Sequence, residues 1–230
     1  MKTIGLIGGT SWQSTVEYYK IINEAVEARL KNNHSAKLLL YSIDFAEVEE
    51  RINRNAFNEI GDMMVDAAKM LEKAGADCLL MCANTMHMFA PLVQDSITIP
   101  LIHIVDSIVP SIKQKHASKL GLLGTKPTMQ MDFYKDRYIK EGLQIVVPDE
   151  IEMDRIMEII FTELFKGIIN PETKTYLLSL IDGLIREGAD GIILGCTELP
   201  LIIQQSDVKV PVFDTTELHA LAAVDFALKA

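Results

Sequence analysis

The sequence is poor in cysteine, tryptophan and positive charge. Its 230 residues include three cysteines and one tryptophan, and 22 basic residues stand against 32 acidic ones, for a formal net charge of −10. Three cysteines without a secretory signal predict free thiols rather than a disulfide framework. The acidic balance, without any basic run, argues against nucleic acid as a partner.

Long hydrophobic runs are missing as well. Hydrophobic residues make up 49% of the chain, but no segment approaches the roughly 20 uninterrupted apolar residues that a membrane-spanning helix needs. The amino terminus, MKTIGLIGG, begins directly as a short apolar strand, without the apolar stretch and cleavage site of a signal peptide. We therefore expect a soluble, globular, cytoplasmic protein with no membrane partner.

Parts of the sequence occur twice. GADCLLMCANT, from Gly75, aligns without gaps with GADGIILGCTE, from Gly188, which lies 113 residues further along. GLIGGT, from Gly5, recurs in shortened form as GLLGT, from Gly121. Repeats in the same order predict an internal duplication, and hence two similar domains related by a pseudo-twofold axis. We expect the active site in the cleft between them.

Short apolar strands alternate with amphipathic helices along the chain. Apolar runs of this length suit parallel strands covered on both faces, so the fold class is α/β, with two doubly wound parallel sheets. The expected strands are 3–7, 37–43, 78–81, 101–104, 120–123, 144–147, 192–194 and 210–213. The expected helices are 14–30, 59–74, 106–115, 129–141, 150–165, 172–187 and 216–228.

Polar turns follow four of these strands at the carboxyl end, where doubly wound sheets bind ligands. They are residues 8–11, 82–85, 124–125 and 195–198. The loop Gly8-Gly9-Thr10-Ser11 opens a helix, so its backbone N–H groups could hold an anion such as a carboxylate. A plain tight turn is the alternative, because the loop lacks the spacing of nucleotide-binding loops.

The two repeated turns differ in their reactive side chains. Cys196 aligns with Ala83, whereas Cys82 is one residue out of step. The positions that follow pair Thr197 with Asn84 and Glu198 with Thr85. The duplication therefore predicts a symmetric scaffold that carries an asymmetric pair of reactive positions.

Cys196 is the candidate reactive thiol. It follows a strand and leads into a helical segment, where backbone N–H groups and the helix dipole can lower a thiol pKa; a buried, inert cysteine is the alternative. Cys78 lies inside an apolar strand and is expected in the core, while the direction of Cys82 stays open. A zinc site from Cys78, Cys82 and His87 is disfavoured because no paired C-x-x-C motif is present. His87 and His219 are expected to make structural hydrogen bonds, although either could tune a thiol.

Several motifs in order give the chain a resemblance to a known family. They are GLIGGT at residues 5–10, NTMH at 84–87, GLLGT at 121–125 and GCTELP at 195–200. With these motifs the sequence resembles the aspartate/glutamate racemases, which are independent of pyridoxal phosphate, and it looks closest to their broad-spectrum amino-acid racemase branch. Trp12, the Ser-x-Asp-Phe run at residues 42–45 and Asp132-Phe-Tyr134 support that branch.

The resemblance carries expectations for the whole protein. It implies no pyridoxal phosphate, no other cofactor and no metal, and it implies a homodimer. The carboxyl-terminal end is expected to complete the first domain, so that residues 1–104 plus 212–230 form one domain and residues 105–211 the other. In this family two cysteines act on opposite faces of the substrate α-carbon, one removing the proton and the other returning one, as inversion requires.

The sequence departs from the family pattern at two places. The position of the first catalytic cysteine carries Ala83, which supplies neither acid nor base, so a water, Cys82 after a local shift, or another group would have to serve that face. The aspartate-specific members resemble one another in a lysine two residues before the glycine that ends a helix. Here Phe165 precedes Gly167 at that spacing, which favours a neutral or larger amino acid unless Lys166 or Arg51 reaches the substrate.

The resulting hypothesis is a cofactor-independent amino-acid racemase-like enzyme that acts on an amino acid or a related carboxylic acid. Cys196 is the acid or base, and Ala83 marks the altered opposite position. The substrate carboxylate and amino group are assigned to Asn84, Thr85, Thr125 and Thr197, while Thr10, Thr128 and Glu198 line the pocket. The alternatives are a single-cysteine decarboxylase or cis-trans isomerase on the same scaffold, and a small-molecule binder that has lost catalysis.

Overall fold

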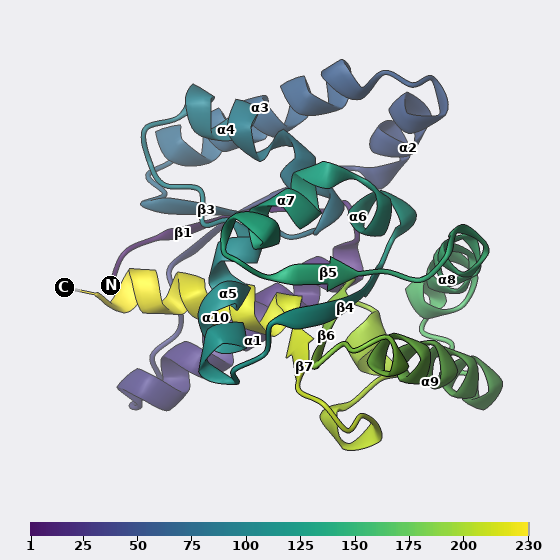
Figure 1. The fold of residues 1–230 in the computed structure, drawn as a ribbon. Coiled ribbons are helices and arrows are strands. Elements are labelled where there is room, and N and C mark those ends of the chain that lie inside the picture. Colours follow the sequence, from purple (N-terminus) through teal and green to yellow (C-terminus); the bar gives the residue numbers. More distant parts are fainter. Residues whose placement is uncertain (230) are drawn as a thin grey trace. The chain divides into compact units, whose positions relative to one another are not determined.

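The computed structural model describes residues 1–229 and divides the chain into two compact units (Figure 1). Unit 1 contains Met1–Ile104 and the chain from His219 onward, and unit 2 contains Val105–Leu218. Each unit is built on one parallel sheet, so the predicted α/β class with two parallel sheets is confirmed.

Unit 1 holds a three-stranded sheet in the order β2-β1-β3. Its strands are β1 (Ile4–Gly8), β2 (Leu38–Ser42) and β3 (Cys78–Met81), and Leu101 adds an isolated parallel bridge to Leu79. Its helices are α1 (Trp12–Leu30), α2 (Phe45–Asn53), α3 (Phe57–Lys73), the 3-10 helix η1 (Thr85–Phe89), α4 (Ala90–Ser96) and most of α10 (Thr215–Leu228).

Two apolar cores cover the two faces of this sheet. Ile7, Leu79 and Met81 face a core completed by α2, α3 and α4. Ile4 and Leu6 face a second core completed by α1 and α10 (Figure 1). Neighbouring strand residues alternate between the two cores because successive side chains point to opposite faces. The sheet is therefore wound with helices on both sides.

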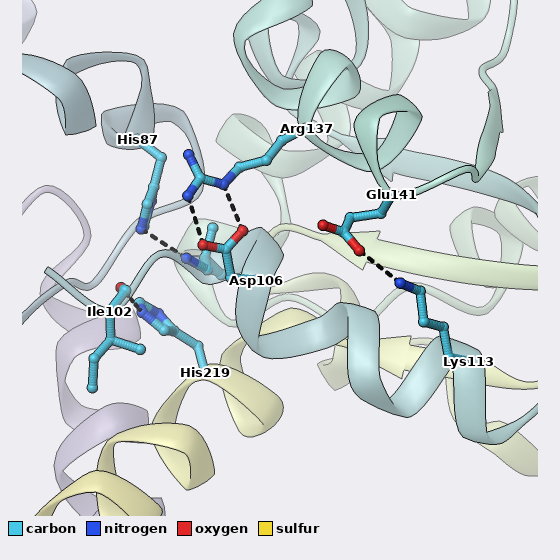
Figure 2. A network of polar contacts seen from close by, with 8 residues as sticks. His87, Ile102, Asp106, Lys113, Arg137, Glu141 and His219 are labelled. Carbon is cyan, nitrogen blue, oxygen red and sulfur yellow. Dashed lines mark hydrogen bonds and ion pairs between the residues drawn. The ribbon is translucent and has the colours of Figure 1, made fainter.

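Unit 2 holds a four-stranded sheet in the order β5-β4-β6-β7. Its strands are β4 (Lys119–Gly124), β5 (Gln144–Val146), β6 (Gly191–Gly195) and β7 (Val212–Asp214). Its helices are α5 (Ile104–Gln114), α6 (Lys126–Gln130), α7 (Asp132–Lys140), α8 (Glu150–Thr162) and α9 (Pro171–Arg186), with short 3-10 turns η2 (Leu164–Lys166), η3 (Leu199–Leu201) and η4 (Gln205–Asp207). Two ion pairs link α5 to α7 and the residue that follows it, between Asp106 and Arg137 and between Lys113 and Glu141 (Figure 2).

The internal duplication extends to the pairing of individual residues. Gly5 pairs with Leu79 in unit 1, and Gly121 pairs with Ile192 in unit 2. The N–H of Leu79 donates to Pro100 O at 2.9 Å, and the N–H of Ile192 donates to Pro211 O at 2.8 Å. The strand order β2-β1-β3 followed by the Leu101 bridge thus corresponds to β5-β4-β6-β7.

The aspartate of each Gly-Ala-Asp repeat joins neighbouring strands at the end of the sheet opposite the polar turns. Asp190 accepts hydrogen bonds from the backbone N–H groups of Ser118 and Lys119 and from the Ser118 hydroxyl, at 2.9–3.0 Å. Asp77 accepts one from the N–H of Thr3 at 2.6 Å. This part of the repeat is therefore structural.

Some expected boundaries differ from the structure. Residues 212–218 were expected in the first domain, but they belong to unit 2 because β7 pairs with β6. The expected strand 101–104 is reduced to the Leu101 bridge, since α5 begins at Ile104. The expected helix 129–141 is two helices, and α2 and α4 were not predicted. α2 and α4 are short, with 9 and 7 residues, so they give little periodic signal.

We predict that Asp190→Ala lowers the free energy of unfolding by about 1–3 kcal/mol, because charge-assisted hydrogen bonds from three donor groups are lost at once. Asp77→Ala is the matched control in the other unit and should cost clearly less, because one such bond is lost. Urea denaturation of both variants measures the difference. Equal losses would contradict the assignment of Asp190 as the stronger strand connection.

Candidate active site

In unit 1 the turns after β1 and β3 are tied together, because these strands are neighbours in the sheet. The N–H of Cys82 donates to Ile7 O at 2.9 Å, and the Ser14 hydroxyl donates to Cys82 O at 3.0 Å. The turn that contains Thr10 therefore lies beside the turn that contains Ala83. Thr10 is buried at this edge.

The Gly8–Ser11 loop is held by hydrogen bonds to the first turn of α1. Gly9 has φ +89°, and a Cβ there would lie 2.0 Å from Ile43 O, so glycine is required. The N–H of Gly9 donates to Thr15 Oγ1 at 2.9 Å, and Ser11 caps α1 by accepting from the N–H of Ser14. The Gly9 N–H, one of the groups expected to hold an anion, is thus occupied by Thr15.

The structure decides which way Cys82 points. Cys82 belongs to the core under α1 and α10, whereas Ala83 packs against the core on the opposite face. Burial raises the pKa of the Cys82 thiol well above its usual range. Cys78 is likewise buried in the core, as predicted, and burial raises its pKa to about 12. Among residues 1–229, neither thiol of unit 1 therefore lies on the side of Ala83.

Asn84 and Thr85 begin the 3-10 helix η1, whose first hydrogen bond runs from the N–H of His87 to Asn84 O at 3.1 Å. Asn84 is buried and Thr85 is half-buried. His87 Nδ1 lies 2.9 Å from Ala83 O, so this side chain bonds to the carbonyl of the altered position. The three expected residues of this turn lie together at the carboxyl end of β3.

A second buried histidine lies nearby in the same unit. His219 Nδ1 lies 2.7 Å from the Tyr18 hydroxyl, and His219 Nε2 lies 2.7 Å from Ile102 O. Burial, reinforced by neighbouring His87, lowers the pKa of His219 to about 3, against the opposing effect of the bond to Ile102. The imidazole is therefore neutral at physiological pH.

In unit 2 the turns after β4 and β6 also approach one another closely. A Cβ on Gly124 would lie 2.8 Å from Gly195 O, and Thr128 Cγ2 lies 3.4 Å from the Cβ position of either glycine. Thr125 Oγ1 and Thr128 Oγ1 are hydrogen-bonded at 3.1 Å. These glycines permit the contact, and both threonines lie at the carboxyl ends of the strands.

Cys196, Thr197 and Glu198 form one hydrogen-bonded group in the turn after β6. The Cys196 thiol donates to Glu198 Oε2 at 2.9 Å, and the Thr197 hydroxyl donates to the same oxygen at 2.7 Å. Both Cys196 and Glu198 are buried. A buried thiol beside a carboxylate is a pair that can exchange one proton.

The expected lowering of the Cys196 pKa is wrong. Burial raises the pKa of this thiol well above its usual range, and the Glu198 carboxylate raises it further; together they outweigh the lowering by the backbone groups of Thr197 and Glu198 that the sequence led us to expect. The helical segment that follows is only the three-residue 3-10 turn η3, so no long helix presents its amino-terminal end to the sulfur. Cys196 therefore rests as a thiol.

Three side chains bear on whether the substrate can carry an acidic side chain: Phe165 and Lys166 in unit 2, and Arg51 in unit 1. Phe165 packs against Phe161, with ring centroids 4.9 Å apart. Lys166 is exposed. Arg51 donates to Glu47 O at 2.7 Å and pairs with Glu59 at 3.4 Å. Arg51 therefore already has an acidic partner in Glu59, although its buried Nε makes no hydrogen bond within residues 1–229.

Sequence reasoning missed several buried hydroxyls that hold the site turns. Thr15 bonds to Gly9, Ser14 to Cys82 O, and Thr215 donates to Leu194 O at 2.8 Å. Their position in the first turns of α1 and α10, at strand ends, is the signal that could have found them. Within the described part of the chain, no group of three or more His, Cys, Asp or Glu side chains could hold a metal ion, and no helix is long and apolar enough to cross a membrane.

Comparison with known proteins identifies the class. The family model of the Asp/Glu/hydantoin racemases matches residues 7–223. The broad specificity amino-acid racemase RacX of Bacillus subtilis (strain 168) is 26% identical over 170 residues, which cover 73% of this chain and 72% of RacX. The chain therefore belongs to the Asp/Glu/hydantoin racemase family.

Solved structures agree with this assignment over the full length. A Yersinia pestis structure, provisionally described as an Asp/Glu racemase, is 42% identical with a TM-score of 0.94. An aspartate racemase homologue from Pyrococcus horikoshii OT3 is 38% identical with a TM-score of 0.89. Both likenesses cover 100% of each chain.

The depressed pKa of His219 predicts a pH-dependent stability. Because the folded state resists protonation of His219 until about pH 3, the unfolded chain, with an ordinary histidine pKa near 6.5, binds more protons between these values. Stability from this group is therefore complete above about pH 6.5 and falls on acidification, by up to about 1.4 kcal/mol per pH unit.

His219→Gln should remove this component while keeping a donor for Ile102 O. Urea denaturation of both proteins at pH 7, 6 and 5 measures the slope, above the range where carboxylates titrate. The variant should be less stable at pH 7 but lose less stability on acidification. Parallel slopes would rule out His219 as the source.

Proposed function

We propose that the protein is a cofactor-independent amino-acid racemase in which Cys196 exchanges a proton with the substrate α-carbon. The observation that carries the proposal is the buried contact of 2.9 Å between the Cys196 thiol and Glu198, in a chain of the Asp/Glu/hydantoin racemase family. The similarity to RacX supports an amino acid as the substrate.

Glu198 would hold the thiol proton while the thiolate acts. In the resting pair the proton lies on Cys196, because burial and the carboxylate both raise the thiol pKa. In this form Cys196 can deliver a proton to a carbanion. For the reverse step, Glu198 takes the thiol proton and the thiolate then removes the α-proton. The α-ammonium group of a bound amino acid would favour the thiolate, since an opposite charge nearby lowers a thiol pKa.

The remaining expected residues would hold the substrate rather than react. We assign the α-carboxylate and amino group to Asn84, Thr85, Thr125 and Thr197, with Thr10 and Thr128 completing the substrate contacts. Hydrogen bonds to the carboxylate also stabilise the enediolate that forms when the α-proton leaves. On the face opposite Cys196, Ala83 leaves a water molecule as the candidate proton carrier, because Cys82 faces the core.

The substrate side chain would be neutral. Phe165 occupies the place of the lysine found in aspartate-specific members, and its ring packs on Phe161. An apolar surface of this kind favours an uncharged side chain, since a carboxylate there would lose its hydration without gaining a partner.

A second candidate is a reaction that needs one thiol, such as decarboxylation followed by protonation on one face, or cis-trans isomerisation of a diacid. It is favoured by a specific observation: in the described residues, Cys196 is the thiol that lies in a polar turn, while Cys78 and Cys82 face the core. A catalytically impaired binding protein is the third possibility.

The decisive experiment is α-proton exchange in D2O, followed by NMR for L- and D-amino acids. A racemase exchanges the α-proton with inversion, a one-base site exchanges it with retention, and silence with every amino acid would count against the proposal. Cys196→Ser should abolish exchange, because a serine hydroxyl is too weak a base at neutral pH, while substrate binding stays within about tenfold. Cys78→Ser is the matched control and should lower stability by about 1–3 kcal/mol with exchange retained.

Ala83→Cys tests the altered position directly. If this turn faces the substrate α-carbon, a new thiol there should raise the racemisation rate by about 10² to 10⁴-fold, the usual contribution of a general acid or base. The gain must vanish in the double variant with Cys196→Ser. No gain with any amino acid, in a variant that folds and binds normally, would favour the one-thiol reaction.

A further inference from the structure

The buried histidines of unit 1 connect the Ala83 turn to the places where the chain passes between units. His87 Nε2 lies 3.2 Å from the backbone N of Ile104, the last residue before the chain enters unit 2 (Figure 2). His219, the first residue after the chain returns, bonds to Ile102 O. The rings of His87 and His219 lie 5.4 Å apart, centroid to centroid.

The partners of each ring fix its tautomer. A backbone N–H only donates, so His87 Nε2 must accept from Ile104, and the ring proton of His87 must be on Nδ1, where it donates to Ala83 O. A carbonyl only accepts, so His219 carries its proton on Nε2 and donates to Ile102 O, while Nδ1 accepts from the Tyr18 hydroxyl. The two histidines therefore have opposite tautomers.

Both nitrogens of His87 are used by backbone groups from different segments. The Nδ1 bond restrains the carbonyl of Ala83, directly before Asn84 and Thr85. The Nε2 bond restrains the chain at Ile104. His103, which directly precedes Ile104, is also buried. Its ring packs edge-to-face against the ring of His87, with the two ring centroids 4.7 Å apart. The ring of His87 is thus held on several sides.

We propose that His87 is the positioning residue of the Ala83–Asn84–Thr85 turn, and that the bond from its Nδ1–H to Ala83 O is the contact that places the turn for substrate. The proposal rests on the proposed function, because Asn84 and Thr85 are its substrate-binding groups. His87 acts through the backbone of Ala83.

Two substitutions separate the two bonds of His87. In His87→Asn the side-chain amide N–H lies near the position of Nδ1 and can still donate to Ala83 O, but the bond from Ile104 is lost. In His87→Gln the side-chain oxygen lies near the position of Nε2 and can still accept from Ile104, but the bond to Ala83 is lost. Each variant loses one bond to a backbone group, the Ile104 bond being buried and the Ala83 bond part-buried, so a purely structural role would cost His87→Asn at least as much as His87→Gln.

The expected result is a difference between the variants in α-proton exchange. The kcat of His87→Asn should stay within about threefold of the unmodified protein, and that of His87→Gln should fall by about 10²-fold, the effect of a misplaced binding group. His34→Gln, at an exposed histidine, is the control for a histidine substitution as such. Equal kcat values for the two His87 variants, or a lower value for His87→Asn, would overturn the proposal.

Two further measurements do not depend on turnover. The imidazole nitrogen shifts of the unmodified protein, read by ¹⁵N NMR, should show the proton of His87 on Nδ1 and that of His219 on Nε2; the reverse for His87 would overturn the proposal without any variant. The amide of His87, which donates to Asn84 O, reports on the turn by hydrogen exchange. It should exchange about tenfold faster in His87→Gln than in His87→Asn, and equal rates would also contradict the proposal.

These measurements distinguish a failure of the inference from a failure of the proposed function. If no amino acid is exchanged but the tautomers and amide exchange agree, the proposed function fails and His87 remains the residue that positions the turn. If exchange occurs and the His87 variants behave alike, the function stands and the positioning role fails.

Discussion

The pairing of a glycine with a large apolar residue at the centre of each sheet is a packing constraint that the two units share. A Cβ on Gly5 would lie 2.5 Å from Leu79 Cδ2, and one on Gly121 would lie 2.8 Å from Ile192 Cδ1. Both contacts are far closer than packed carbon atoms allow. Because each glycine leaves this space, the neighbouring strand can bury its branched side chain against the central strand; a side chain at the glycine would force the end of Leu79 or Ile192 to shift.

In each copy of the repeat, the residues at one end of the sheet hold neighbouring strands together, and those at the other end form the polar turn. At one end Asp77 and Asp190 accept a hydrogen bond from the corresponding backbone N–H groups of Thr3 and Lys119, and Asp190 accepts further bonds from Ser118. At the other end the copies differ, with an amide and a hydroxyl after β3 and a thiol beside a carboxylate after β6. The residues at the amino ends of the strands are thus similar in the two units, while those at the carboxyl ends differ. This is expected if the two copies differ in their substrate contacts and not in how they fold.

Much of the fold could be predicted because strands and turns leave local signals. The short apolar runs indicated the parallel sheets, the repeats indicated two similar units, and the Cys78–Met81 strand was placed correctly. The assignment of residues 212–218 failed because membership of a sheet depends on which strand pairs with β7, and the sequence of a strand does not name its neighbour. The prediction that the Cys196 pKa is lowered failed for a similar reason. Burial of the thiol and its contact with Glu198 arise from packing and cannot be read from the sequence of the turn.

Cys82 and Ala83 are neighbours in the sequence, but their side chains point to opposite faces of the sheet. Along β3 and beyond, side chains alternate between the two cores, so Met81 and Ala83 share one side and Cys82 the other. Moving the Cys82 thiol to the side of Ala83 would take it out of its core and would push Met81 and Ala83 off theirs. A local shift is therefore opposed by the packing of both faces at once. The sheet of unit 1 thus fixes the direction of Cys82, and any acid or base that acts beside Ala83 would have to come from a group other than this neighbouring cysteine.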